Sequence, residues 1–299
     1  MTFQNVSKVL LCVSTLLVIG SIALFIYPGP KFSIEFTGGT LLQIQTVDGK
    51  TRDDVLQAVR SYEEASKEDL GNVSVTAVKT ATEHGFVLRL RPMSNEEHVA
   101  LLASLEKSLG KVDEQHYNTI GPSLSASLKT KSLQAIAFAS IAVILYLALA
   151  FRKLPRKMNA WKFGILAIVG FLHDVIITTG AFIILGWFTT FEFDTLFVTA
   201  LLTILAYSAN DTIVIFDRIR DNMSFDNRSE DLSAIIIRGL RQCVTRTFST
   251  AIAALIMLFS LFFLGSESIR WFILALIFGT VIGAYSSYFI AAPLLMYWK

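Results

Sequence analysis

The sequence predicts an α-helical polytopic membrane protein with six transmembrane helices and an α+β, ferredoxin-like domain between helices 1 and 2. Three observations predict this fold class. Hydrophobic residues make up 53% of the 299 residues and charged residues only 17%, whereas charged residues reach roughly 25% in soluble domains. Six apolar runs are long enough, or nearly so, to cross a hydrocarbon core of about 30 Å as helices. The segment between the first two runs instead shows alternating and amphipathic patterns.

The six apolar runs divide the chain into its predicted parts. A Pro-Gly-Pro sequence, and no small-residue cleavage site, follows the run at 9–27, so we interpret this run as a retained helix. We assign residues 1–30 to the amino terminus and first helix, 31–132 to the α+β domain, and 133–299 to the other five helices. The runs are residues 9–27, 133–151, 163–185, 196–216, 248–264 and 271–298.

Basic residues predict the orientation of the chain in the membrane. The segment 152–162 holds five Lys or Arg and no acid, and 217–247 holds six Arg. The intervening segments 186–195 and 265–270 are poor in cations. Because basic residues collect on the cytoplasmic side, we expect 152–162 and 217–247 to be cytoplasmic loops. Both termini are then inside, and the α+β domain is outside.

The order of elements in the α+β domain is predicted to be βαββαβ, the split βαβ arrangement. Apolar and polar residues alternate as in strands. Capping boxes at Thr51 and Asp54, and at Ser94 and Glu97, start two amphipathic helices, of which Gly110 ends the second. Residues 31–132 contain 12 Lys or Arg and 14 Asp or Glu. This charge balance is typical of a solvated domain without an anion-binding role. The strands are expected at 41–47, 73–78, 86–90 and 112–117.

Enzyme, nucleotide and metal chemistry have no support in the sequence. The single Gly-Lys-Thr, at Gly49, lacks the glycine that a phosphate-binding loop has five residues earlier, where Ile44 stands. The four histidines have no ligand spacing, and Cys12 and Cys243 suggest neither a disulfide framework nor a metal site. The net charge of +2 shows no nucleic-acid footprint. We therefore expect no enzyme activity, no cofactor, no metal and no nucleic-acid partner.

Polar side chains inside the apolar runs mark the candidate site. Asp174 and Asp211 each interrupt a run, at an insertion cost of about 2.5–3.5 kcal/mol. Adjacent helical residues face different ways, so His173 and Asp174 are expected to point apart. Gly279 and Gly283 form a G-x-x-x-G pattern that allows close helix packing. The predicted supporting polar face consists of Asn210, Ser208, Thr212, His173, Thr178 and Thr250.

Two hypotheses explain the intramembrane carboxyls. A carboxyl in a medium of low dielectric constant can bind and release a proton near neutral pH. Arg246, at the start of the fifth run, could then couple that proton to helix movement, with Asp211, Arg246 and Asp174 as proton-coupling residues. Alternatively, Asp211 or Asp174 is a protonated carboxyl that joins two helices by hydrogen bonds, and Arg246 is a positive-inside anchor. The sequence alone leaves these alternatives open.

Five segments resemble one family of transport proteins. They are "FSIEFTGGT" at 32–40, with Gly38 and Gly39, "IGPSL" at 120–124, "HDVIITTG" at 173–180, "YSANDTIVIFDRIRDN" at 207–222 and "RTFST" at 246–250. In this order they resemble the SecF branch of the SecD/SecF family of protein-export membrane subunits, in the RND superfamily. The resemblance extends from the first span to the last. One position departs, because Ala206 stands where the family usually has Gly.

The resemblance implies an accessory, non-enzymatic subunit of the bacterial Sec translocase in the inner membrane, built as half of an RND-type transporter. Its implied partners are SecD in a heterodimer, the SecYEG channel, YajC and YidC, together with unfolded exported polypeptides and membrane lipid. Asp211 and Arg246 match the family's membrane-embedded Asp and Arg, which use the proton motive force. The competing hypotheses are a stand-alone RND-type exporter of lipid or small molecules, and a passive scaffold of the export channel.

Overall fold

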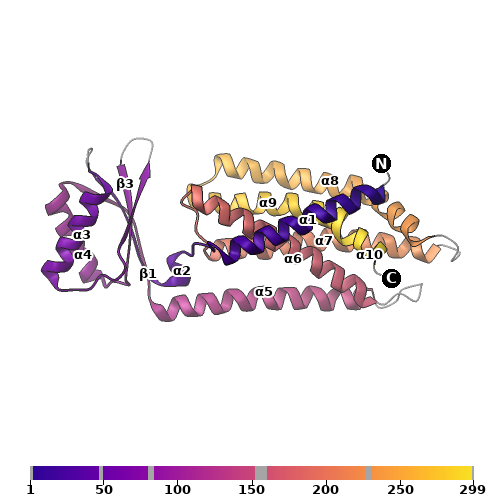
Figure 1. Cartoon of the computed structure of the whole chain (residues 1–299), viewed down its shortest axis with the longest axis horizontal. Coiled ribbons are helices and arrows are strands. Elements are labelled where there is room, and N and C mark those ends of the chain that lie inside the picture. Colours follow the sequence, from indigo (N-terminus) through magenta and orange to yellow (C-terminus); the bar gives the residue numbers. More distant parts are fainter. Residues whose placement is uncertain (1–2, 47–49, 80–83, 152–159, 226–230, 298–299) are drawn as a thin grey trace. The chain divides into compact units, whose positions relative to one another are not determined.

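A computed structural model of the chain describes residues 3–46, 50–79, 84–151, 160–225 and 231–297 (Figure 1). It contains two compact units. One is the α+β domain, Phe32–Lys131, and the other combines Met1–Lys31 with Ser132–Lys299. Six helices are long and apolar enough to cross a membrane, so the predicted fold class is confirmed.

The α+β domain has the predicted order βαββαβ. Its elements are β1 (Gly39–Thr46), α3 (Arg52–Ser66), β2 (Ser74–Lys79), β3 (His84–Leu90), α4 (Asn95–Leu109) and β4 (Val112–Ile120). The sheet is antiparallel in the order β2-β3-β1-β4, with β1 between β3 and β4. Helices α3 and α4 cover one face of this sheet (Figure 1). Leu42 and Ile44 of β1, Val59 of α3 and Leu101 and Leu105 of α4 are completely buried between them.

Local chemistry fixes the helix ends in this domain. Both predicted capping boxes are present, at Thr51 with Asp54 and at Ser94 with Glu97. A short helix that the sequence analysis missed, α2 (Ile34–Thr37), precedes β1. Gly38 and Gly39 follow it with φ of 73° and 121°, a region that favours glycine. A Cβ at Gly39 would also lie 2.7 Å from the Leu90 carbonyl oxygen, so both glycines are required by the turn into the sheet.

The membrane unit is a bundle around α6, α7 and α9. Helix α7 packs against α6, α8 and α9, and α1 packs on α6. Most residues of α1 and α5 are exposed, because these helices lie at the edge of the bundle. The helices are α1 (Phe3–Ile26), α5 (Pro122–Ala150), α6 (Ala160–Phe188), α7 (Thr195–Phe225), α8 (Leu232–Leu264), α9 (Arg270–Ser286) and α10 (Ala292–Tyr297), with a 3-10 turn at Glu267–Ile269.

The last apolar run is not one regular helix. A π-helical turn, Ser287–Ala291, separates α9 from α10. Pro293 has no N–H, and its ring crowds the carbonyl group four residues earlier, at Phe289, so regular helical hydrogen bonding cannot continue there. The wider turn accommodates this break and changes which side chains of the run face the bundle.

The predicted cytoplasmic loop at 217–247 is helical over most of its described residues. Helix α7 continues to Phe225 and α8 begins at Leu232. The apolar run ends earlier than the helix because the added turns are amphipathic. Ile219 and Met223 face the core, whereas Arg218 is exposed. The other predicted loop, 152–162, lies outside the described residues except where α6 begins at Ala160.

Candidate functional site

Asp174 on α6 is the centre of a buried hydrogen-bond network, in which only His173 Nε2 lacks a partner among the described residues. Asp174 is fully buried. Its Oδ2 accepts hydrogen bonds from Ser208 Oγ of α7 at 2.6 Å and from Ser286 Oγ of α9 at 2.9 Å. Its Oδ1 lies 3.0 Å from His173 Nδ1. The expectation that His173 and Asp174 point apart is therefore wrong, because the imidazole turns back to the neighbouring carboxyl. Three helices meet at this single carboxylate.

The π-helical turn supplies a second link between α7 and α9. Ser287 donates to the Ser208 carbonyl at 3.3 Å, and its Oγ lies 2.9 Å from Thr212 Oγ1. A hydroxyl has one proton, so Thr212 is the donor in the second contact. Both Ser286 and Ser287 are fully buried. Consecutive residues can face the same neighbours here because the helix widens immediately after Ser286.

Glycines allow this close approach of α9 and α7. A Cβ at Gly279 would overlap the Ile204 side chain. A Cβ at Gly283 would lie 3.3 Å from Ser208 Cβ and 3.7 Å from Asp174 Oδ2. A side chain at Gly279 would therefore displace Ile204, and one at Gly283 would require Ser208 to shift by a few tenths of an ångström.

Asp211 on α7 has different surroundings. Its side chain is only 4% exposed, and its Oδ2 is buried with no hydrogen-bond partner. A buried, ionised carboxylate without hydrogen-bond partners is costly. Ser208 and Thr212, on adjacent turns of α7, already bond to α6 and α9. Asp211 instead faces α8.

Contacts along the antiparallel pair α7 and α8 show which residues lie level with Asp211. Gly239 packs on Ile219, Gln242 accepts a hydrogen bond from Arg218, and the Cys243 thiol lies 3.9 Å from the Val214 carbonyl oxygen. As the residue number falls along α7, the number of the residue it contacts on α8 rises. One further turn places Arg246 and Thr247 level with Asp211.

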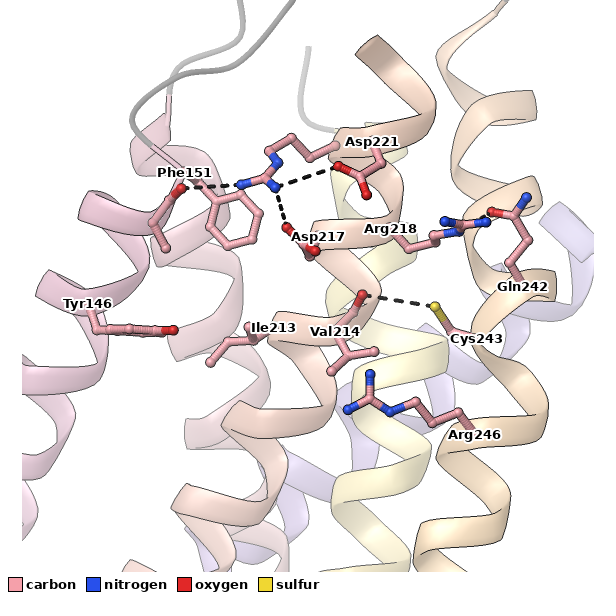
Figure 2. Close-up of a pocket in the computed structure, with 12 residues that line it drawn as sticks. Tyr146, Phe151, Ile213, Val214, Asp217, Arg218, Asp221, Gln242, Cys243 and Arg246 are labelled. Carbon is pink, nitrogen blue, oxygen red and sulfur yellow. Dashed lines mark hydrogen bonds and ion pairs between the residues drawn. The ribbon is translucent and has the colours of Figure 1, made fainter. Parts of the chain in front are cut away.

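Arg246 is the cation nearest to this carboxyl on the facing helix. Its guanidinium acts electrostatically on Asp211, and Figure 2 shows it reaching from α8 toward α7 below Val214. Arg246 is exposed. Among the described residues it forms no ion pair within 4.0 Å. Asp211 and Arg246 therefore interact electrostatically without forming an ion pair.

A cleft of ≈ 560 Å³ opens at the basic end of these helices (Figure 2). Arg246, Val214 and Asp217 are among the side chains that line it. At its rim Arg220 lies 2.6 Å from Asp217 and over the Phe151 ring, which attaches α7 to the end of α5. The cleft thus surrounds Arg246 with polar and charged groups. Its residues on α7 lie between Asp211 and the carboxyl end of that helix.

The remaining residues of the predicted polar face differ in burial and in hydrogen bonding. Thr178 is fully buried, and its hydroxyl has no partner in the described structure. Asn210 is exposed, on a different side of α7 from Asp211. Thr250 is exposed, and its hydroxyl bonds to carbonyls of its own helix. The predicted polar face is thus divided between a buried network and an exposed surface.

Four further residues belong to the site although their roles were not predicted. Ser286 and Ser287 complete the network around Asp174. Tyr207 and Thr247 each carry a buried hydroxyl without a partner beside Asp211. Their helical spacing was visible, but the sequence gave no sign of which neighbour each faces. Within the described part of the chain, no cluster of three His, Cys, Asp or Glu could hold a metal ion.

Comparisons with known proteins agree on one family. The family model for the protein export membrane protein SecD/SecF, C-terminal, matches residues 101–299. The protein translocase subunit SecF of Thermobaculum terrenum is 37% identical over 284 residues, which cover 94% of this chain and 88% of that protein. The SecF of a Synechocystis species is 31% identical and covers 96% of this chain and 90% of its own.

Relatives also include longer proteins. The translocase subunit SecDF of Thermus thermophilus is 30% identical over 91% of this chain but only 35% of its own length. A crystal structure of SecDF, described as a translocon-associated membrane protein, matches all of this chain with a TM-score of 0.81 and 28% identity. The match covers 38% of that solved chain, so this chain corresponds to just over a third of it.

Proposed function

Because the chain belongs to the SecD/SecF family of protein-export membrane proteins, we propose that it is an accessory subunit of a Sec protein translocase. In this proposal it uses the proton motive force, together with a SecD partner, to promote the movement and release of exported polypeptides. The relatives named as translocase subunits support the class of function. The Asp211 site supports the coupling.

The observation that carries the coupling is a buried carboxylate with an unpartnered oxygen, level with an arginine on the facing helix. In a medium of low dielectric constant, an ionised Asp211 attracts Arg246 several times more strongly than it would in water. Protonation removes that attraction. Alternate protonation then favours two positions of α8 relative to α7. One charge crossing 100 mV supplies roughly 2.3 kcal/mol, enough to shift a two-state equilibrium about fifty-fold.

A partner subunit fits the surface of α7 and α8. Asn210 and Arg246 are exposed on helices that cross the membrane, and polar groups of this kind are costly against lipid. Thr199 and Thr203, also exposed on α7, satisfy their hydroxyls within the helix. We assign this surface to a SecD-type half, since some relatives carry both halves in one chain. SecYEG, YajC and YidC are proposed as further partners by analogy with the family.

The chain is a multi-pass membrane protein. We propose the bacterial inner membrane as its location, with both termini cytoplasmic, the α+β domain periplasmic and the Arg246 cleft on the cytoplasmic side. The basic residues of 152–162 and 217–247 support this orientation. Exported polypeptides would then meet the α+β domain as they emerge.

Two other functions compete with this proposal. A stand-alone RND-type exporter needs two six-helix halves, which would require a dimer of this chain. A passive scaffold needs neither the proton nor the charge at Asp211.

Purification of the full chain in a mild detergent tests the class. We expect a SecD-type subunit or the export channel to elute with it. A symmetric homodimer without either would support the exporter instead.

A further inference from the structure

Tyr207 presents a buried hydroxyl one helical turn before Asp211. Both side chains lie on the face of α7 directed at α8, since residues four apart in a helix are neighbours. The Tyr207 hydroxyl oxygen and Asp211 Oδ2 are both buried, and neither forms a hydrogen bond of good geometry. The Thr250 hydroxyl of α8 interacts with the Tyr207 phenol. The Asp211 carboxylate also acts electrostatically on the Tyr207 phenol. The two unpartnered atoms therefore belong to one seam between α7 and α8.

A third unpartnered oxygen lies in the same seam. Thr247 of α8 is 1% exposed, its Oγ1 has no partner, and the pairing of the two helices puts it level with Asp211. Buried tyrosine hydroxyls usually find a partner, and most buried polar side-chain atoms are hydrogen-bonded. Because all three atoms are shielded within this chain, a partner subunit or lipid cannot reach them. They can be satisfied by one another, by water held between them or, in the case of Tyr207, by the Thr250 hydroxyl of α8.

We propose that Tyr207 is a positioning residue for the proton-carrying carboxyl of Asp211. When Asp211 is ionised, the Tyr207 hydroxyl donates a hydrogen bond to Oδ2, directly or through one water that Thr247 also holds. When Asp211 is protonated, its own O–H donates to the Tyr207 oxygen. The hydrogen bond reverses direction and the Tyr207 O–H bond never breaks. The proton that leaves Asp211 passes to water, and Tyr207 gains and loses none.

This arrangement keeps the carboxyl in one orientation through the cycle. Arg246, the charged group that faces Asp211 from α8, can attract only the ionised form. His173 and Asp174 of α6 are engaged in their own network. The Tyr207 hydroxyl can both donate and accept a hydrogen bond, so it can serve both protonation states of Asp211, a capacity that it shares with the Thr247 hydroxyl. The inference rests on the proposed function, because it concerns the group that would carry the proton.

The test replaces Tyr207 by Phe in the full chain and reads the carboxyl directly. In purified protein in lipid nanodiscs, the infrared C=O band of protonated Asp211 is identified as the band that Asp211→Asn removes. We expect Tyr207→Phe to move this band to higher wavenumber, since the carboxyl loses a hydrogen bond. In membrane vesicles, export driven by the proton gradient should fall by on the order of tenfold, as expected when a charged group loses one hydrogen bond.

Tyr285→Phe is the matched control. The Tyr285 hydroxyl bonds Ser14 Oγ at 2.8 Å and donates to the Leu10 carbonyl at 3.1 Å, so it joins α9 to α1. Its removal should lower the melting temperature but leave the carboxyl band and export unchanged. Tyr207→Phe should lower the melting temperature by no more than Tyr285→Phe does, because each change removes one hydroxyl and its hydrogen bonding.

An unchanged band in Tyr207→Phe overturns the proposal, and so does an equal shift in both variants. Loss of the fold in Tyr207→Phe also overturns it, since it would reveal a structural partner for the hydroxyl. The infrared result is independent of the export assay. If Asp211→Asn retained gradient-driven export, the proposed function would fail, while the band could still report contact between Tyr207 and Asp211.

Discussion

Two carboxylates are buried in the bundle on adjacent helices, and their surroundings are opposite. Asp174 is saturated by Ser208, Ser286 and His173. Asp211 is almost as deeply buried, yet its Oδ2 has no hydrogen-bond partner and Arg246 forms no ion pair with it. Burial alone therefore does not identify a proton carrier. We propose Asp211 as the carrier because its hydrogen bonding is incomplete, whereas Asp174 has three side-chain partners.

The largest expected difference between the two carboxyls is in activity. Asp211→Asn removes the titrating group but is nearly isosteric, so gradient-driven export should fall to background while membrane insertion and partner binding persist. The measurement is export of a reporter protein into inverted membrane vesicles, with and without a proton gradient. Full activity in this variant would contradict the assignment and leave either Asp174 as the carrier or the chain as a passive scaffold.

Substitution of Arg246 tests whether the difference between Asp211 and Asp174 depends on the cation that faces Asp211. Arg246→Ala removes the charge that responds to Asp211, and export should fall about tenfold, in line with the loss of a charge-assisted interaction. Arg246→Lys keeps the charge but loses the planar fork of donors, so a partial defect is expected. The same vesicle assay measures both. If Arg246 is only an anchor at the membrane surface, the Ala variant will export like the wild type.

Sequence reasoning succeeded where local chemistry decides the structure. In the α+β domain, Thr51, Ser94 and Gly110 mark helix ends by their own capping geometry, and alternation reveals the strands. The same reasoning identified Asp174 and Asp211, because a carboxylate in an apolar run is conspicuous. It placed the ends of the membrane helices too early, since the turns around Ile219 and Met223 lie beyond the apolar run yet remain helical.

The partners of each carboxyl could not be predicted. Helical spacing puts Ser208, Asp211 and Thr212 within about one turn of α7. Only tertiary packing shows that Ser208 and Thr212 face α6 and α9, whereas Asp211 faces α8. Ser286 and Ser287 both turn inward because a π-helical turn intervenes, and a 3.6-residue period predicts no such turn. The network around Asp174 is therefore a property of packing.

Asp174 should matter first for stability. Asp174→Ala leaves the Ser208 hydroxyl and the His173 imidazole without their buried partner, whereas Ser286 keeps the Gly283 carbonyl as an acceptor. We expect a cost of about 3 kcal/mol. For a protein of this size that lowers the melting temperature by on the order of 8 °C. Differential scanning fluorimetry in detergent measures the shift. Asp211→Ala is the matched control and should lower the melting temperature by only about 3 °C, because it loses at most the single hydrogen bond proposed from Tyr207. Equal destabilisation by both changes would remove the contrast between the two sites.

The smallest effect is expected at a half-buried carboxylate–arginine pair at the domain surface, which serves as the partly solvated reference for Asp211 and Arg246. In the α+β domain, Arg91 Nη2 lies 2.5 Å from Glu97 Oε1. These hydrogen bonds from Arg91 hold the pKa of Glu97 below its usual range. Glu97→Gln removes the charge but keeps an acceptor for the capping box with Ser94, so the variant isolates the ion pair.

A pair near solvent contributes only about 0.2–1 kcal/mol, and the lowered pKa fixes its pH dependence. The stabilisation is complete at neutral pH, where Glu97 is ionised in both states, and is lost as the pH falls from about 4.3 through the lowered folded-state value. We expect a fragment of residues 31–132 to unfold cooperatively in urea, since it has its own core. The wild-type fragment should be more stable than Glu97→Gln at pH 7, and the two should converge near the acid limit of folding. A disordered fragment would contradict the autonomy of the domain. A difference that persisted unchanged in acid would show that Glu97 acts through its hydrogen bonds rather than its charge, and the partly solvated pair would then be no reference for the buried one.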